Sequence, residues 1–278
     1  MRKLCIALSY LEDNCSACLM KNIKEAGFDG VFVTVNKDSD IETIDKNVKE
    51  SGLFFDSLHG PFYEMHHMWN LEDEKEARDI IEEYKKCIDF CVYVKTDKIV
   101  THPFIGFKDH NPNEIGVKRF EEIVKCAKEK NIKVCFENVE GEEYLDALMD
   151  YLLPRYDNVF FCLDSGHEMC YNRGKDMLKK YGKNLGYLHI DDNYGVSGKE
   201  IYFLDDIHLV PGDGKLNIDF LCERIKKYDP KENINITLEL SVPKQPVLGV
   251  QKEYSDIGLK EYLNRCYNVA KLIKDKTE

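Results

Sequence analysis

The feature that most constrains the fold is a regular alternation of short apolar runs with longer amphipathic stretches. The apolar runs are rich in Val, Ile, Leu and Phe, which is typical of strands covered on both faces in a parallel sheet. The stretches between them, most clearly 72–92, 114–130 and 259–273, have apolar residues at helical spacing. The predicted strands are residues 4–8, 30–35, 53–58, 98–101, 132–136, 160–163, 185–188 and 234–238.

Eight strand-then-helix units in 278 residues predict an α/β protein, a (β/α)8 TIM barrel, with one domain over residues 1–278. A doubly wound open sheet is the alternative. It normally needs fewer strands, and no glycine-rich phosphate loop follows the first predicted strand. The hydrophobic fraction of 43% is sufficient for a core of this size.

The composition also bears on compartment and partners. No apolar run approaches the roughly 18 residues of a membrane span, and Glu12 and Asp13 follow the first apolar run too closely for a signal peptide. We therefore expect a cytoplasmic protein without a membrane partner. The net charge is −12, and lysines alternate with glutamates along the amphipathic stretches, so we expect no nucleic-acid partner.

Eleven cysteines, an odd number scattered along the chain, argue against a disulfide framework. Cys15 and Cys18 form a lone C-x-x-C pair. A zinc site would need a second ligand pair at suitable spacing, and a redox role is the weaker alternative to two ordinary thiols at the start of a helix.

Carboxylates and imidazoles follow the predicted strands where the strands end. In a barrel these ends meet at one mouth, where active sites lie. Buried carboxylates repel one another unless a cation offsets their charge, and a mixed set of oxygen and nitrogen ligands suits Mn²⁺, Zn²⁺, Co²⁺ or Mg²⁺. The residues at the strand ends are His59, His102, Glu137, Asp164 with His167, His189 and Glu239, and the long loop after the seventh strand adds Asp206 and His208. Five of the eight histidines belong to this set.

The motifs around these residues resemble the xylose-isomerase-like barrel superfamily, specifically the sugar phosphate isomerase/epimerase group that includes D-tagatose 3-epimerase. The resemblance covers nearly the whole chain. The motifs that agree are His59-Gly60-Pro61, His102-Pro103, Phe136-Glu137-Asn138, Leu163-Asp164-Ser165-Gly166-His167, His189-Ile190-Asp191-Asp192-Asn193, His208-Leu209-Val210-Pro211-Gly212-Asp213-Gly214 and Leu238-Glu239.

By this resemblance, Glu137, Asp164, His189 and Glu239 hold one divalent metal ion, and Glu137 and Glu239 are the catalytic pair on opposite faces of a small carbohydrate. Removing a proton α to a carbonyl requires a carboxylate base and a cation that stabilises the enediolate. The implied activity is a metal-dependent sugar or sugar phosphate isomerase/epimerase. His59, His102, His167, Asp206 and His208 then bind the substrate.

One departure from the family pattern concerns an arginine. The ketose 3-epimerases have an Arg a few residues after the metal-binding histidine, whereas Asp191, Asp192 and Asn193 follow His189 here. Arg173 is the nearest arginine to any of the motifs. The missing arginine disfavours the function of a free-ketose 3-epimerase. It also disfavours tight binding of a sugar phosphate.

Three alternative functions remain. The apurinic-site DNA endonucleases of the same superfamily bind three zinc ions, and all nine of their ligand types are present here. If this chain had that function, His59, His102, His167, Asp206 and His208 would bind metal instead of substrate. A lyase or dehydratase acting on a polyhydroxy acid or cyclitol would use the same proton abstraction. A metal-dependent sugar-binding protein is the non-enzymatic alternative, which the intact Glu137 and Glu239 pair disfavours.

The loop of residues 62–69 is rich in aromatic residues. Phe62 and Trp69 would form an apolar wall against a sugar ring, or the loop would pack on the barrel or on a partner subunit. Apolar loops of this kind also suggest that the chain forms a homo-oligomer.

Overall fold

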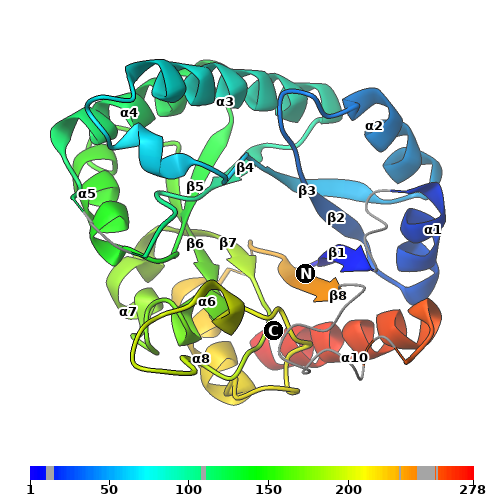
Figure 1. Cartoon of the computed structure of the whole chain (residues 1–278). Coiled ribbons are helices and arrows are strands. Elements are labelled where there is room, and N and C mark those ends of the chain that lie inside the picture. The colour runs from blue at the N-terminus through cyan, green and yellow to red at the C-terminus, as the bar shows by residue number, and fades with distance from the viewer. Residues whose placement is uncertain (11–15, 108–110, 232, 243–253, 255) are drawn as a thin grey trace.

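Eight parallel strands form a nearly closed barrel in the computed structural model, which describes residues 1–10, 16–107, 111–231, 233–242, 254 and 256–278. Figure 1 looks along the barrel, with the strands inside and the helices around them. The predicted (β/α)8 TIM barrel is confirmed. The strands are β1 (Leu4–Tyr10), β2 (Gly30–Thr34), β3 (Phe54–His59), β4 (Lys98–Thr101), β5 (Lys133–Glu137), β6 (Val159–Asp164), β7 (Leu185–His189) and β8 (Ile236–Val242).

Each strand pairs with its neighbour in the chain, and β1 also pairs with β8 along its whole length, from Leu4 opposite Ile236 to Tyr10 opposite Val242. Only a single bridge, between Ile190 and Leu238, joins the β7 side to β8 among the described residues. The backbone N–H of Ile190 donates to the carbonyl of Thr237 at 2.9 Å, which brings the end of β7 beside β8.

The helices cover the outside of the barrel because each presents one apolar face to it. The helix α4, for example, buries Phe120, Ile123, Val124 and Ala127, as its spacing predicts. The helices are α1 (Ala17–Ala26), α2 (Ile41–Glu50), α3 (Glu74–Val94), α4 (Glu114–Glu129), α5 (Glu142–Leu152), α6 (Ser165–Met169), α7 (Met177–Tyr181), α8 (Ile218–Tyr228) and α10 (Leu259–Thr277).

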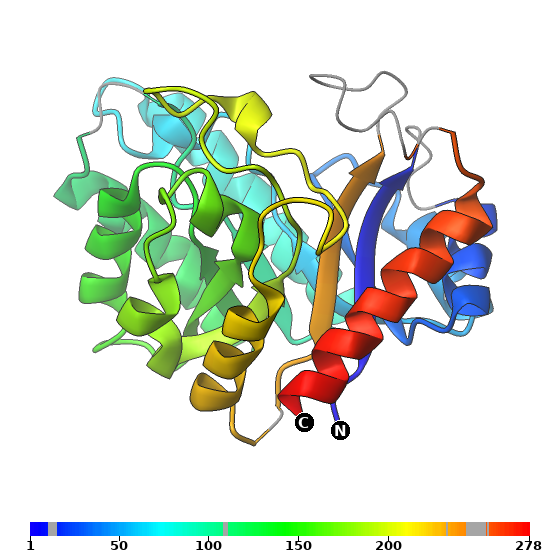
Figure 2. The same cartoon turned by 90° about the horizontal axis from the view of Figure 1, so that it is seen from below.

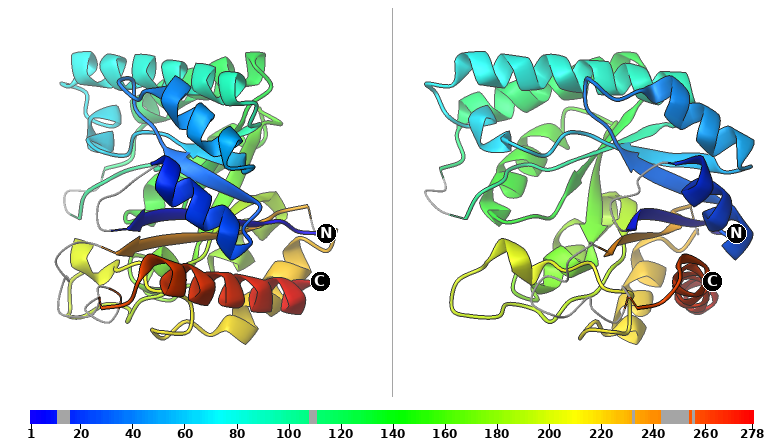
Figure 3. Two further views of the ribbon diagram at one scale, coloured as in Figure 1. Left: turned by 90° about the vertical axis from the view of Figure 1, so that its right-hand side faces the viewer. Right: turned by 45° about the vertical axis from the view of Figure 1, so that its right-hand side comes forward.

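Both termini lie at the end of the barrel opposite the arrowheads of β1 and β8 (Figure 2). The backbone N–H of Arg2 donates to Glu278 at 3.2 Å, and the buried Arg2 guanidinium pairs with Asp229 at 2.6 Å. The last helix, α10, runs alongside β1 and β8 and also packs on α1 and α8 (Figure 3). Among the described helices, none is both long and apolar enough to cross a membrane.

The strands run slightly further than the sequence predicts. His59, Glu137, Asp164 and His189 are the last residues of β3, β5, β6 and β7, rather than the residues after them. Glu239 lies inside β8, because β8 continues to Val242 in register with β1. These side chains are consequently held by strand backbone and not by loops.

Candidate metal centre and ligand pocket

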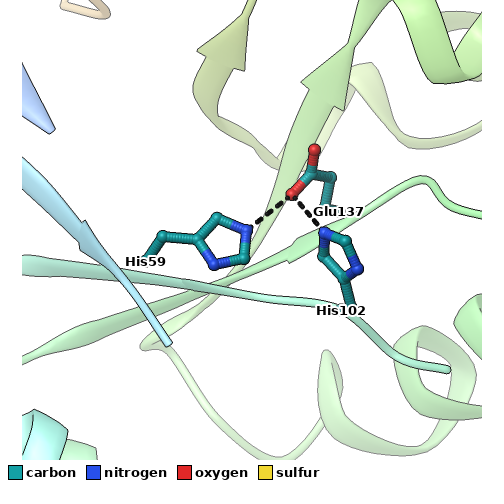
Figure 4. Close-up of side chains that lie close together, drawn as sticks. All are labelled: His59, His102 and Glu137. Carbon is teal, nitrogen blue, oxygen red and sulfur yellow. Dashed lines mark hydrogen bonds and ion pairs between the residues drawn. The ribbon is translucent and has the colours of Figure 1, made fainter. Parts of the chain in front are cut away.

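Glu137 is the centre of the buried polar cluster at the barrel mouth. Its Oε2 lies 3.3 Å from Nε2 of His59 and 3.3 Å from Nε2 of His102, and Figure 4 shows both rings pointing at this oxygen. Its Oε1 lies 3.0 Å from Nδ1 of His189 and 3.3 Å from Nδ1 of His167. Burial would raise the pKa of Glu137, but His189 and His102 outweigh it and hold the pKa well below its usual range.

The predicted metal ligands come together. Glu137, Asp164, His189 and Glu239 each offer a ligand atom within 4.8 Å of the others. Nδ1 of His189 is the shared neighbour, at 2.8 Å from Oε2 of Glu239, 3.0 Å from Glu137 and 4.0 Å from Oδ2 of Asp164. Burial and the neighbouring Asp191 raise the pKa of Asp164 well above its usual value.

The donor set fits a divalent cation. Three carboxylates and one imidazole share a buried space, and Oδ2 of Asp164 has no hydrogen-bond partner. A buried carboxylate oxygen without a donor costs free energy unless a cation approaches it. Oxygen ligands with one imidazole suit Mn²⁺, Mg²⁺, Zn²⁺ or Co²⁺.

Two further groups of possible ligands flank this one. The first consists of His59, His102 and Glu137, and the second of Asp191, Asp206 and His208. In the second group, Nε2 of His208 lies 3.1 Å from Oδ2 of Asp206, and the same oxygen lies 3.1 Å from Nε2 of His167. All nine residues predicted from the strand ends are therefore at one mouth: His59, His102, Glu137, Asp164, His167, His189, Asp206, His208 and Glu239.

The sequence analysis did not single out Asp191 and Cys162. Asp191 is fully buried, accepts a hydrogen bond from the Gly166 N–H at 2.7 Å and lies 3.4 Å from Nδ1 of His208. Cys162 forms another group with Glu137 and His189. Both lie two residues from a predicted ligand, and residues two apart in an extended strand share a face. The two-residue repeat of an extended chain was therefore the sequence pattern that could have identified Asp191 and Cys162 as neighbours of the predicted ligands.

Asp192 holds the loop that contains Asp206 and His208. Its Oδ1 accepts from the backbone N–H groups of Asn193, Lys215 and Leu216, and its Oδ2 from those of Gly212 and Gly214, all at 2.8–2.9 Å. A Cβ on Gly214 would lie 2.4 Å from Asp192 Oδ1, so only glycine allows this approach. The Pro-Gly-Asp-Gly motif thus serves to wrap the chain around a carboxylate.

A pocket of about 360 Å³ opens beside the candidate metal ligands. Its polar side is made of imidazoles and carboxylates, and its apolar side includes Phe62, Ile105, Phe107, Tyr171 and Phe203. The polar residues in the lining are Thr34, His59, His102, Glu140, His167, Asp206, His208 and Glu239. Arg173 does not line the pocket, and its guanidinium instead donates to the carbonyl of Lys199 at 2.9 Å.

The expectation for Trp69 requires correction. Phe62 lines the pocket, but Trp69 is 4% exposed and belongs to the hydrophobic core. Its ring packs on Phe120 and Tyr144, and its Nε1–H donates to the Pro103 carbonyl at 2.8 Å. Because burial in the core removes a large apolar ring from water and the N–H still finds an acceptor, this is the more stable location.

This chain belongs to the xylose isomerase-like TIM barrel family, whose model matches residues 20–256. An inosose isomerase of Bacillus licheniformis is 26% identical over 180 residues. The match covers 61% of this chain and 64% of the isomerase, which is less than two thirds of that protein.

Two solved structures have the same fold. The zinc-bound IolI protein has a TM-score of 0.75 at 20% identity, with 99% of each chain covered. The D-psicose 3-epimerase of Clostridium cellulolyticum H10, solved with D-tagatose, has a TM-score of 0.71 at 14% identity, with both chains fully covered.

Proposed function

We propose that this protein is a divalent-metal-dependent isomerase or epimerase that acts on a polyhydroxy ketone. The observation that supports this most directly is the group of Glu137, Asp164, His189 and the half-buried Glu239 beside a pocket large enough for a monosaccharide or cyclitol. The isomerase and epimerase names of the relative and of one solved structure agree with the proposal.

In this proposal the same four residues hold the ion. A bound divalent cation supplies positive charge that polarises a carbonyl and stabilises the negative charge that develops when an α proton leaves. The remaining requirement is a carboxylate that can reach that proton from the pocket.

The two glutamates are not equivalent for this task. Glu239 lines the pocket, and its side chain is 21% exposed. Glu137 is fully buried and lies within 3.3 Å of four imidazoles. We therefore assign proton removal to Glu239. Glu137 takes part in proton return only after its histidine contacts rearrange.

Glu239 is in the ionised form that a base requires. Burial would raise its pKa, but His189 outweighs burial and lowers the pKa, so the carboxylate is ionised at neutral pH. Because a lowered pKa weakens the carboxylate as a base, a bound cation would have to supply part of the driving force by making the substrate C–H more acidic. The imidazoles of His59, His102, His167 and His208 line the pocket, where their N–H groups would donate hydrogen bonds to substrate oxygens.

The proposal is tested by metal analysis followed by proton exchange. Untagged protein purified without chelator is expected to contain about one Mn, Co, Mg or Zn per chain. Incubation with an inosose or a ketose panel in D₂O should then introduce deuterium at the carbon next to the carbonyl, detected by NMR. Glu239→Gln should abolish the exchange, whereas Glu129→Gln, an exposed change at the end of α4, should leave it intact. Metal-loaded protein that exchanges no proton in any of these compounds contradicts the proposal.

A three-metal phosphodiesterase is the second candidate, because two further groups of possible ligands, His59 with His102 and Glu137, and Asp191 with Asp206 and His208, lie beside the first. Clustered cations can activate water and stabilise a phosphodiester leaving group. The net charge of −12 disfavours a nucleic-acid partner. Three zinc ions per chain, together with cleavage of abasic-site DNA, would establish this function instead.

The same D₂O experiment separates the remaining alternatives. Loss of water from a polyhydroxy acid or cyclitol, seen as a new product, would identify a lyase or dehydratase. Sugar binding with neither exchange nor product would indicate a binding protein.

A further inference from the structure

Glu140 is a buried acid in the pocket that the proposed chemistry does not use. It lies three residues after Glu137, is 4% exposed, and shares the pocket lining with His167, Asp206 and Glu239. Burial raises the pKa of this carboxyl.

Other buried acids outside the metal cluster have partners. Glu168 pairs with the Arg224 guanidinium at 2.8 Å, Asp229 with Arg2 at 2.6 Å, and Asp192 accepts five backbone N–H groups. Within the described part of the chain, Glu140 has no ion pair, and its carboxyl accepts from the backbone N–H of Gly106. A buried carboxyl that lines a pocket and has no cationic partner is a candidate for ligand recognition.

The carboxyl of Glu140 is held in place by one of its oxygens. Oε1 accepts from the Gly106 N–H at 2.7 Å. Gly106 has a φ of +139°, and a Cβ there would lie 3.1 Å from the Phe104 ring. The loop after β4 therefore favours glycine at this position. Because Oε1 is engaged, Oε2 remains as the acceptor for a group in the pocket.

We propose that Glu140 is a specificity-determining residue that accepts a hydrogen bond from a substrate hydroxyl and disfavours phosphorylated substrates. This inference rests on the proposed function. A hydroxyl is a donor that suits a carboxylate, whereas a phosphate at the same place would put acceptor oxygens against a carboxyl that has no cationic partner among the described residues. The ligand class that follows is a neutral polyol ketone whose apolar face lies against Phe62, Phe107 or Tyr171.

The test compares neutral with phosphorylated probes on Mn²⁺-loaded protein. Isothermal titration with 2-keto-myo-inositol, D-fructose and D-fructose 6-phosphate should show that the parent binds a neutral probe more tightly than the phosphate. Glu140→Gln preserves the shape and the Gly106 contact but removes the charge. A hydrogen bond to a charged group corresponds to roughly 10- to 100-fold in affinity, so neutral binding should weaken by about that factor and the preference over the phosphate should shrink.

Two further variants complete the design. Gly106→Ala should displace the N–H that orients Glu140 and weaken neutral binding in the same direction, so the idea stays testable if Glu140→Gln does not fold. Glu129→Gln, a surface change of the same type, should alter neither affinity. A parent that binds D-fructose 6-phosphate as tightly as the neutral probes, or that binds no neutral probe, overturns the inference.

Deuterium exchange separates this inference from the proposed function. Unchanged affinity in Glu140→Gln alongside proton exchange in the parent rejects the role of Glu140 and leaves the isomerase proposal intact. Weakened affinity in a protein that never exchanges a proton supports the role of Glu140 and rejects the isomerase.

Discussion

Replacing Asp192 by asparagine should loosen the loop that contains Asp206 and His208 without unfolding the barrel. The carboxylate accepts five backbone N–H groups, three at Oδ1 and two at Oδ2. Asparagine has the same shape but replaces one oxygen with an NH₂ donor. At least two N–H groups, those of Gly212 and Gly214, would then lose their acceptor and face a donor.

The size of the effect follows from these contacts. Each buried donor left without an acceptor costs about 1–3 kcal/mol, so two cost about 2–6 kcal/mol. Because the loop can open toward water, we expect the lower end, about 2 kcal/mol, which is about a 30-fold change in the opening equilibrium.

Hydrogen–deuterium exchange with mass spectrometry measures this directly. Protection of the segment 209–216 should fall by about 30-fold in Asp192→Asn, while the strands stay protected. The control is Asp219→Asn, because the Asp219 side chain is 75% exposed. Unchanged exchange in 209–216, or an equal loss of protection in all strands, would refute the view that this carboxylate holds this loop.

Three other predictions concern the stability and reactivity of the barrel. A Gly→Ala change inside a helix usually stabilises a protein by about 1 kcal/mol. Gly116→Ala should instead lower the free energy of unfolding by up to about 2 kcal/mol, because the added Cβ would lie 2.1 Å from the Trp69 ring. Urea unfolding, together with a shift in the fluorescence of the single tryptophan, measures this. Among the described cysteines, Cys18 is exposed and should react first with a thiol reagent in the native protein, as mapped by peptide mass spectrometry. Burial raises the pKa of Cys135 to about 12. The folded pKa is above the unfolded value of about 8.5, so this contribution to stability is present below pH 8.5 and is lost as pH rises toward 12. The melting temperature should therefore fall less between pH 8.5 and 10 in Cys135→Ala than in the parent.

Much of the barrel was predictable because its strands and helices have distinct local patterns. Short runs rich in apolar residues indicated every strand, and helical spacing gave α4 to within one residue and the first residue of α10, which ends four residues later than predicted. The strand ends were less certain, because hydrogen bonding to a neighbour decides where a strand stops. The extension of β8 to Val242, which places Glu239 inside the strand, depends on its pairing with β1.

The nine polar residues at the barrel mouth could be found from sequence, because parallel strands bring their carboxyl ends to one face. The location of Trp69 could not. An aromatic residue in a loop after a strand can face the pocket or the core, and contacts with Phe120 and Tyr144, distant in sequence, decide between them.

The periodicity of the chain specifies the alternation of strands and helices, and with it the end of the barrel at which His59, Glu137, Asp164 and His189 gather. Which neighbours each of these groups contacts depends on how the folded segments pack together. Glu137 is enclosed by four imidazoles, Glu239 reaches the pocket, and Glu140 is buried there with no charged partner among the described residues. The physical reason is that a periodic pattern specifies the face on which a side chain lies, whereas distances, burial and charge depend on packing between segments far apart in the chain.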